Sequence, residues 1–309
     1  MKKIARAVLV TLGSLVLLLA VIGVLQRPHT TLPPGVAGSH VEVEGLALRY
    51  VQQGSGPDVL LLHGSPGSVE DWEPVLPRLA RHFRVTAYDR IGHGYSDGVD
   101  LPHTPSENAR ITLALMRALG LRDVIAVGHS YGGATVLRLA TGRPPELKGV
   151  VTVGARAYPP AVIEPLYRVV ALPVVGTGVA TFLSPFIGQK RISAGIRDSF
   201  GPNAGAIPPG FIEARVHLWT MPTIVATLSR ERTMLDEDLA VAVPLYPSIK
   251  VPVRVICGVE DARNYQDAQR LARELPTARL VSLPQTGHYV QFVHPEAVVA
   301  AVEEVAGLR

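Results

Sequence analysis

The chain has 309 residues, of which 47% are hydrophobic and 18% are charged, a balance that excludes disorder over its whole length. Its 30 basic and 26 acidic residues give a net charge of only +4, and no Lys/Arg run marks a surface for nucleic acid. A single cysteine, Cys257, excludes an intrachain disulfide and a cysteine-based zinc cluster.

The N-terminal segment differs from the rest of the chain. Lys2, Lys3 and Arg6 precede an uncharged, apolar stretch at residues 7–25. About 20 apolar residues cross the hydrocarbon core of a bilayer as a helix, so residues 1–25 are predicted to be a signal anchor with one transmembrane helix. Because positive charge stays on the cytoplasmic side, we expect a cytoplasmic N-terminus and an exported remainder. The alternative is a cleaved signal peptide and a secreted protein.

Residues 26–39 contain three prolines and two glycines and are predicted to be a linker. Beyond them, short apolar runs alternate with helical patterns, and Ser106 is the expected N-cap of the second helix. Such apolar strands between helices are typical of a mostly parallel sheet that helices cover on both faces. Strands are predicted over residues 40–51 (two strands, joined at Glu44-Gly45), 59–62, 84–88, 124–127, 150–153, 251–257 and 279–283, and helices over residues 70–81, 106–119, 131–140, 266–275 and 295–305.

The alternation of strands and helices stops after Gly154 and resumes with the strand predicted over residues 251–257. Prolines and helix-like stretches prevail there. We therefore expect an α/β core at residues 40–156 and 248–309, interrupted by an inserted helical cap at residues 157–247.

One stretch of the cap, residues 169–189, carries no charge and is long enough for a second membrane span. Pro173, Gly176, Gly178 and Pro185 argue against a regular helix there. A single crossing at this point would also place the candidate catalytic residues on opposite sides of the membrane. The stretch is therefore interpreted as an apolar lid.

The clearest chemical signal is the G-x-S-x-G sequence from Gly128 to Gly132, with Ser130 at its centre. It lies between an apolar strand and a helix, which is the context of a nucleophile elbow. The small residues permit a tight turn, and the N-terminus of the following helix favours developing negative charge. Ser130 is therefore the candidate nucleophile.

A serine nucleophile needs a general base. His288 follows the strand predicted over residues 279–283, so it is expected at the same edge of the sheet as Ser130. His294 is the less favoured alternative, because it lies at the start of the last helix. His288 is therefore the candidate base.

The base in turn needs a carboxylate that fixes its tautomer and stabilises its charged form. Asp261 follows the strand predicted over residues 251–257 and is the candidate, with its neighbour Glu260 as the alternative. Asp267 is assigned to the helix that follows. The order Ser, Asp, His along the chain is the order that accompanies the nucleophile elbow.

Five ordered segments resemble the α/β-hydrolase superfamily, and in particular its capped serine hydrolases. The resemblance implies that the backbone N–H groups of Ser65 and Tyr131 form the oxyanion hole and that the Ser65-Pro66 peptide bond is cis. Pro66 has no N–H, so this loop departs from the H-G-G-G pattern of some lipases. The five segments are His63-Gly64, residues 89–96, residues 128–133, residues 258–261 and Gly287-His288.

Together, these features predict a membrane-anchored serine hydrolase without a metal or cofactor. A lipophilic, small-molecule carboxylic ester is the favoured substrate, because the lid is apolar and a bilayer lies nearby. A carbon–carbon bond hydrolase, a cofactor-free perhydrolase or haloperoxidase, and an amidase share the same triad and stay open, as does a non-catalytic ligand-binding protein. Epoxide hydrolases and haloalkane dehalogenases of the superfamily use an aspartate nucleophile, so Ser130 argues against both.

Overall fold

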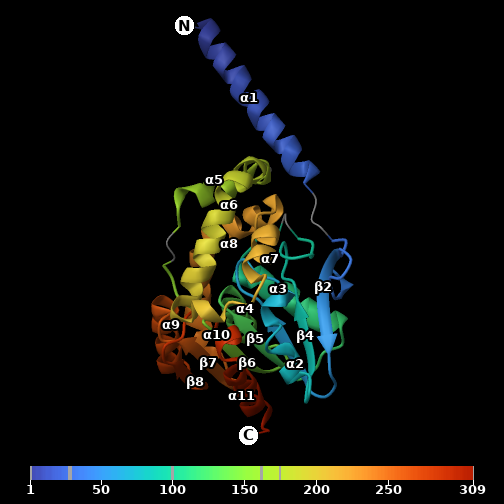
Figure 1. Ribbon diagram of the computed structural model, residues 1–309, viewed down its shortest axis with the longest axis vertical. Helices are drawn as coiled ribbons and strands as arrows, with labels where there is room; N and C mark the ends of the chain where they lie inside the picture. Colours follow the sequence, from blue (N-terminus) through green and yellow to red (C-terminus); the bar gives the residue numbers. More distant parts are fainter. Residues whose placement is uncertain (1, 27–29, 99–100, 161–162, 174, 309) are drawn as a thin grey trace.

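The computed structural model describes residues 2–26, 30–98, 101–160, 163–173 and 175–308 (Figure 1). Residues 27–29 of the expected linker lie outside this description. The strands are β1 (Ser39–Val43), β2 (Leu46–Gln53), β3 (Asp58–Leu62), β4 (Arg84–Tyr88), β5 (Val124–His129), β6 (Leu147–Val153), β7 (Val253–Gly258) and β8 (Ala278–Leu283). The α-helices are α1 (Lys2–Leu25), α2 (Leu76–Leu79), α3 (Pro105–Ala118), α4 (Tyr131–Thr141), α5 (Pro165–Val170), α6 (Gly176–Phe200), α7 (Phe211–Trp219), α8 (Pro222–Ala242), α9 (Ala262–Glu274), α10 (Val290–Val293) and α11 (Pro295–Ala306). The 3-10 segments of the described residues are η1 (Val69–Trp72), η2 (Gly201–Ala206) and η3 (Val243–Ser248).

The strands of the described residues form one eight-stranded sheet in the order β1-β2-β4-β3-β5-β6-β7-β8. β2 runs antiparallel to both β1 and β4, and the other neighbouring strands are parallel. This arrangement confirms the predicted, mostly parallel α/β sheet. Because parallel strands end at a common edge, the loops that follow β3, β5, β7 and β8 meet there.

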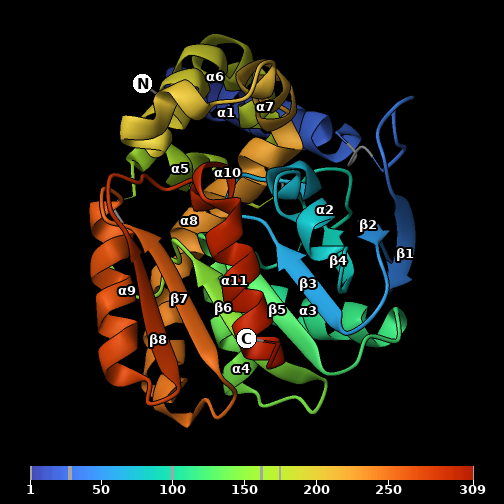
Figure 2. The ribbon, with the colours of Figure 1, turned by 60° about the horizontal axis from the view of Figure 1, so that its bottom comes forward.

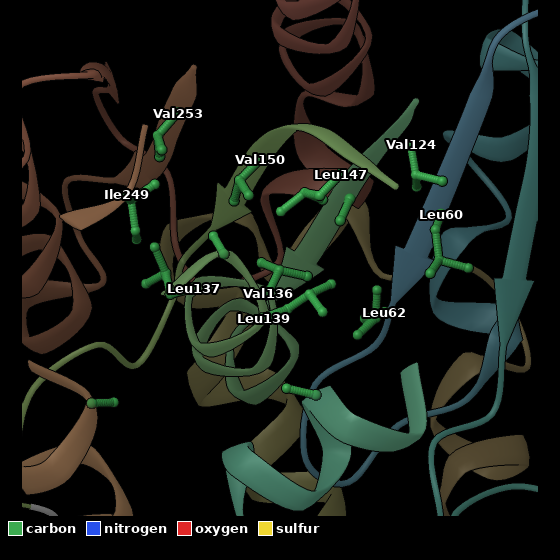
Figure 3. Close-up of a cluster of buried hydrophobic side chains, with 14 of the residues drawn as sticks. Leu60, Leu62, Val124, Val136, Leu137, Leu139, Leu147, Val150, Ile249 and Val253 are labelled. Atoms are coloured by element: carbon green, nitrogen blue, oxygen red, sulfur yellow. The ribbon is translucent and has the colours of Figure 1, made fainter. Parts of the chain in front are cut away.

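Alternating side chains along the central strands divide the core into two layers. Leu60 and Leu62 of β3 pack with residues of α3, α4 and α9, whereas Val59 and Leu61 pack with residues of α2 and α11. Figure 3 shows the first layer, and Figure 2 shows α11 in front of the sheet on the opposite face. Each fully buried leucine stabilises the fold by about 1.5–3 kcal/mol. A slip of one residue in β3 would exchange the two faces, so burial fixes the register.

The chain between β6 and β7 forms the helices α5, α6, α7 and α8. In Figure 1 these helices lie over the part of the molecule where β5 and α4 meet. The predicted break in residues 169–189 is present around Pro173, between the end of α5 at Val170 and the start of α6 at Gly176. The helix α6 nevertheless continues through Gly178 and Pro185, so the expectation that these two residues also interrupt the helix is wrong. Packing of α6 against α1, α7 and α8 outweighs the hydrogen bond that the proline removes.

The prediction of one helix over residues 70–81 is also wrong. The structure replaces it with the 3-10 segment η1 and the single turn α2. Pro74 and Pro77 lie within the segment, and proline cannot donate the backbone hydrogen bond that a continuous helix needs.

Two helix starts also differ from the prediction. The N-cap of α3 is Thr104, whose side chain accepts a 3.1 Å hydrogen bond from the backbone N–H of Glu107, and Pro105 follows it. Ser106 instead lies in the first turn. A proline at the first helical position has the required φ angle and lacks only an N–H that would be unpaired. The helix α9 begins at Ala262, four residues earlier than expected.

Candidate active site

Ser130 lies in the tight turn between β5 and α4. Its φ of +52° is unusual for a residue with a side chain, and its ψ is −112°. A Cβ added to Gly128 would lie 2.2 Å from the carbonyl oxygen of Gly132. A Cβ added to Gly132 would lie 2.4 Å from the carbonyl oxygen of Leu62. Only glycine therefore fits at both positions, and the close approach of α4 to β3 and β5 places Ser130 at the edge of the sheet.

His288 and Asp261 are brought together from the loops after β8 and β7. Nδ1 of His288 and Oδ2 of Asp261 are 2.6 Å apart. Asn264, in the first turn of α9, donates from its side-chain amide to both carboxylate oxygens of Asp261 at 2.9 Å. Asn264 was not predicted as a site residue, although its position three residues after Asp261 is that of a neighbour on a helical turn.

The carboxylate of Asp261 stays charged in this setting. Burial opposes the charged form, but the charge of His288 and the hydrogen bonds from His288 and Asn264 outweigh burial and hold the pKa of Asp261 below its ordinary value. A charged acceptor at Nδ1 fixes the proton on that nitrogen of neutral His288, which leaves Nε2 free to accept a proton.

Ser130 and His288 line the same cavity of about 440 Å³, which lies between the sheet edge and the helices of the cap. Ser65 and Pro66 of the core also line the cavity, as do Trp219 of α7 and residues of α6 and α8. Trp219 was not predicted as a site residue, because its position in the cap sequence is equally consistent with core packing. The cavity gives a substrate simultaneous access to the candidate nucleophile and base.

The turn after β3 lies against Ser130, as an oxyanion loop requires. A Cβ added to Gly64 would lie 3.2 Å from Cβ of Ser130, and the Ser65-Pro66 bond is cis. Tyr131 is the first residue of α4, where backbone N–H groups have no partner within the helix. Ser65 follows the glycine that contacts Ser130, and Tyr131 follows Ser130 itself, so their backbone N–H groups remain the candidate oxyanion donors.

A buried arginine that the sequence argument did not single out supports this turn. Arg90 donates to the carbonyl oxygens of His63 at 3.0 Å and Gly64 at 2.7 Å, and its own backbone N–H donates to Nε2 of His63 at 2.9 Å. Its guanidinium also pairs with Glu231 of α8 at 2.5 Å, and both side chains are fully buried. The cap is thus connected through one ion pair to the candidate oxyanion loop.

The charge on Glu231 is stabilised by its two basic neighbours. Burial alone would favour the protonated carboxyl group, but the charge of Arg90 and the contact with His93, 3.1 Å away, lower the pKa of Glu231 far below its ordinary value. Because Arg90 and Glu231 are 141 residues apart in the chain, no local pattern could reveal this contact.

The cap also contacts the loop that carries His288. The backbone N–H of His288 donates to the carbonyl oxygen of Ser199 at 2.7 Å, and that of Gly287 donates to the side chain of Asn203 at 3.1 Å. A Cβ added to Gly287 would lie 2.5 Å from the carbonyl oxygen of Phe200. The end of α6 and the start of η2 therefore fix the position of the candidate base.

His129, the residue before Ser130, also belongs to the site, although no role was predicted for it from the motif. Its ring centroid lies 4.5 Å from that of His288, and its Nε2 is 3.2 Å from the carbonyl oxygen of His288. Burial and the neighbouring His288 hold the pKa of His129 well below its ordinary value. His129 is therefore neutral and packs beneath the candidate base.

The alternatives to the chosen base and acid lie elsewhere. His294 contacts Glu296 and the hydroxyl of Thr286. Glu260 is exposed to solvent. Asp267 accepts hydrogen bonds from two backbone N–H groups that follow β6. Within the described part of the chain, no three His, Cys, Asp or Glu side chains gather as they would around a metal ion.

The strand order, the strained serine turn and the helical insertion define the fold class of the α/β hydrolases. Residues 59–301 match the profile of the Alpha/beta hydrolase family, and the chain belongs to this family. This finding confirms the resemblance that the sequence motifs indicate.

Three similar proteins align with most of this chain at 27–28% identity. The 2-(acetamidomethylene)succinate hydrolase of Mesorhizobium japonicum is 27% identical over 274 residues, which cover 85% of this chain and 92% of the relative. Haloalkane dehalogenase 2 of Mycobacterium tuberculosis is 27% identical over 276 residues, which cover 84% and 91%. The crystal structure of an alpha/beta hydrolase fold protein from Burkholderia ambifaria superposes with a TM-score of 0.72 at 28% identity, covering 87% of this chain and 100% of that one.

Proposed function

We propose that the protein is a serine hydrolase that cleaves a carboxylic ester through an acyl-enzyme intermediate. One observation carries the proposal: Ser130, at a strained strand-to-helix turn, shares a cavity with His288, whose other ring nitrogen lies 2.6 Å from Asp261. The pairing of a nucleophile with a base that a third group orients is the arrangement that activates serine.

The reaction follows from these positions. Oγ of Ser130 attacks the ester carbonyl carbon while Nε2 of His288 takes the hydroxyl proton, and the backbone N–H groups of Ser65 and Tyr131 bind the oxyanion. The carbon–oxygen bond to the alcohol then breaks, and His288 returns the proton to the departing oxygen. Water, deprotonated by the same histidine, releases the acid and restores Ser130. Asp261 stabilises the charged form of His288 in both halves of the reaction.

Ester cleavage is favoured over amide cleavage because the alkoxide of an ester is a better leaving group than the nitrogen of an amide. One relative is named a 2-(acetamidomethylene)succinate hydrolase and the other a haloalkane dehalogenase, so their names do not select one substrate for this chain. Ser130 stands where superfamily members that displace halide carry aspartate, and this residue separates the proposal from dehalogenation. A ligand-binding protein without turnover would not need the strained serine.

A matched pair of substrates tests the choice of bond. We expect kcat/KM for p-nitrophenyl butyrate to exceed that for p-nitrobutyranilide by at least about 100-fold. The two compounds have the same acyl group and chromophore, so the comparison isolates the ester from the amide. Faster turnover of the anilide or of a 1,3-diketone, or faster peracid formation from acetate and hydrogen peroxide, would favour the corresponding alternative.

We further propose that α1 anchors the enzyme in a membrane, with the N-terminus in the cytoplasm and the catalytic domain exported. Among the described residues, one helix, Lys3–Leu25, is long and apolar enough to span a bilayer, with a mean hydropathy of 2.9 and none of it buried. The end of α1 packs against α6, where a Cβ on Gly178 would lie 2.2 Å from the carbonyl oxygen of Leu19 (Figure 1). Small residues allow such close helix contacts.

Carbonate extraction and protease protection test the anchor and its direction. Full-length protein should stay in the membrane pellet after extraction, whereas a chain that begins at Thr30 should be released, because it lacks the apolar helix. Protease added to spheroplasts should digest the catalytic domain. A soluble mature form that lacks α1 would instead establish a cleaved signal, and a protected catalytic domain would establish the opposite orientation.

A further inference from the structure

A second cavity, of about 100 Å³, lies inside the cap. Its walls come from all four cap helices, α5, α6, α7 and α8. The side chains that line this cavity and not the catalytic one include Leu166, Val170, Leu183 and Val225, which also pack together as a hydrophobic cluster.

The two serine hydroxyls that line this cap cavity are already hydrogen-bonded within their own helices. The hydroxyl of Ser184 donates to the carbonyl oxygen of Ala180 at 2.7 Å, and that of Ser229 donates to the carbonyl oxygen of Val225 at 2.7 Å. Apart from the indole N–H of Trp219, which is buried without a hydrogen-bond partner, a ligand therefore meets a largely hydrocarbon surface, and the matching ligand chemistry is a hydrocarbon chain.

The cap cavity adjoins the catalytic cavity. Both are lined by the same five residues, which form the boundary between them: Tyr167, Arg191, Ile192, Trp219 and Leu228. The charged groups lie on the catalytic side of this boundary or at it. Arg191 pairs with Glu164, and the guanidinium of Arg232 lies 4.6 Å from the ring centroid of Tyr167. A molecule that bridges both cavities would place its polar part near Ser130 and its hydrocarbon end in the cap.

We propose that the cap cavity is a subsite for the hydrocarbon chain of the substrate and that it sets the preferred chain length. The proposal rests on ester hydrolysis at Ser130 and extends it by naming the substrate class: esters with a medium-length alkyl chain. Each methylene that moves from water into such a site should raise kcat/KM about fourfold. A cavity smaller than the ~150 Å³ site that encloses benzene holds only the last few carbons of a chain.

Substitutions at Val225 test the subsite directly, since this residue lines the cap cavity but not the catalytic cavity. The full-length protein in nanodiscs is assayed with p-nitrophenyl acetate, butyrate, hexanoate, octanoate and decanoate. The readout is the ratio of kcat/KM for octanoate to that for acetate, which we expect to exceed about 30-fold in the unmodified protein. Because all variants are measured in the same nanodiscs, the partitioning of long esters into lipid affects every ratio equally.

Val225→Phe should fill the cavity and lower this ratio by at least about tenfold. Val225→Ala should enlarge it and move the best substrate to a longer chain, which keeps the test decisive if the phenylalanine variant does not fold. Val241→Phe is the matched control, because Val241 lies on the same helix, is 63% exposed and borders neither cavity. Its ratio should equal that of the unmodified protein.

Alkyl acetates of the same chain lengths identify which half of the ester occupies the cavity. If Val225→Phe changes the preference in the acyl series, the acid carries the chain; if it changes the preference in the alkyl series, the alcohol does. Equal ratios for all Val225 variants in both series, with esters still hydrolysed, would overturn the subsite and leave ester hydrolysis intact. Absence of hydrolysis for every ester in a folded protein would instead overturn the proposed function.

Discussion

Replacing Ser130 with alanine is expected to lower kcat for ester hydrolysis by about 10⁴- to 10⁶-fold, because triad residues act as a unit. The backbone donors and the cavity remain in this variant, so substrate should still bind. His288→Ala should lose activity to a similar extent, and the double variant should be scarcely worse than either single one. Steady-state and single-turnover hydrolysis of p-nitrophenyl butyrate measure the effect.

Ser55→Ala is a suitable control, because Ser55 is exposed in the loop between β2 and β3. It should retain the full kcat. Retention of more than roughly a tenth of kcat by Ser130→Ala or His288→Ala, at unchanged folding by circular dichroism, would reject the assigned nucleophile or base.

Asp261→Asn is expected to lower kcat by about 10⁴-fold. The asparagine keeps the shape of the side chain but removes the charge that stabilises protonated His288. Its amide nitrogen would donate toward Nδ1 and favour the tautomer that carries the proton on Nε2. The loss should therefore fall on kcat, with a small change in KM.

Glu260→Gln is the matched variant for this experiment, since Glu260 is the adjacent carboxylate and is exposed. It should behave as the unmodified protein does. If Glu260→Gln were the damaging change and Asp261→Asn the mild one, the acid of the proposed triad would be misplaced by one residue.

The sheet and the candidate triad were accessible from the sequence because both depend on local patterns. Runs of apolar residues predicted β3 and β5, whose residues are all buried. The glycines around Ser130 predicted the turn because no other residue fits there. His288 and Asp261 were predicted from their places after β8 and β7, since parallel strands bring such loops to one edge.

Other features depend on contacts that no local pattern records. The helix α6 persists through Pro185 because its neighbours compensate for the missing hydrogen bond. Arg90 looks like an ordinary loop residue until the fold brings Glu231 to it. The cap cavity likewise exists only because four helices converge. In contrast, Pro74, Pro77 and the Thr104-Pro105 pair are local signals, and they predict the interrupted helix and the N-cap that the structure has.

Labelling with a fluorophosphonate shows whether Ser130 is an activated nucleophile. The reagent phosphonylates an activated serine with release of fluoride, and peptide mass analysis locates the adduct. We expect a single adduct on the Ser130 peptide, no adduct in Ser130→Ala, and slow formation in His288→Ala. If the folded, unmodified protein took up no label, or carried it on another serine, Ser130 would not be the nucleophile.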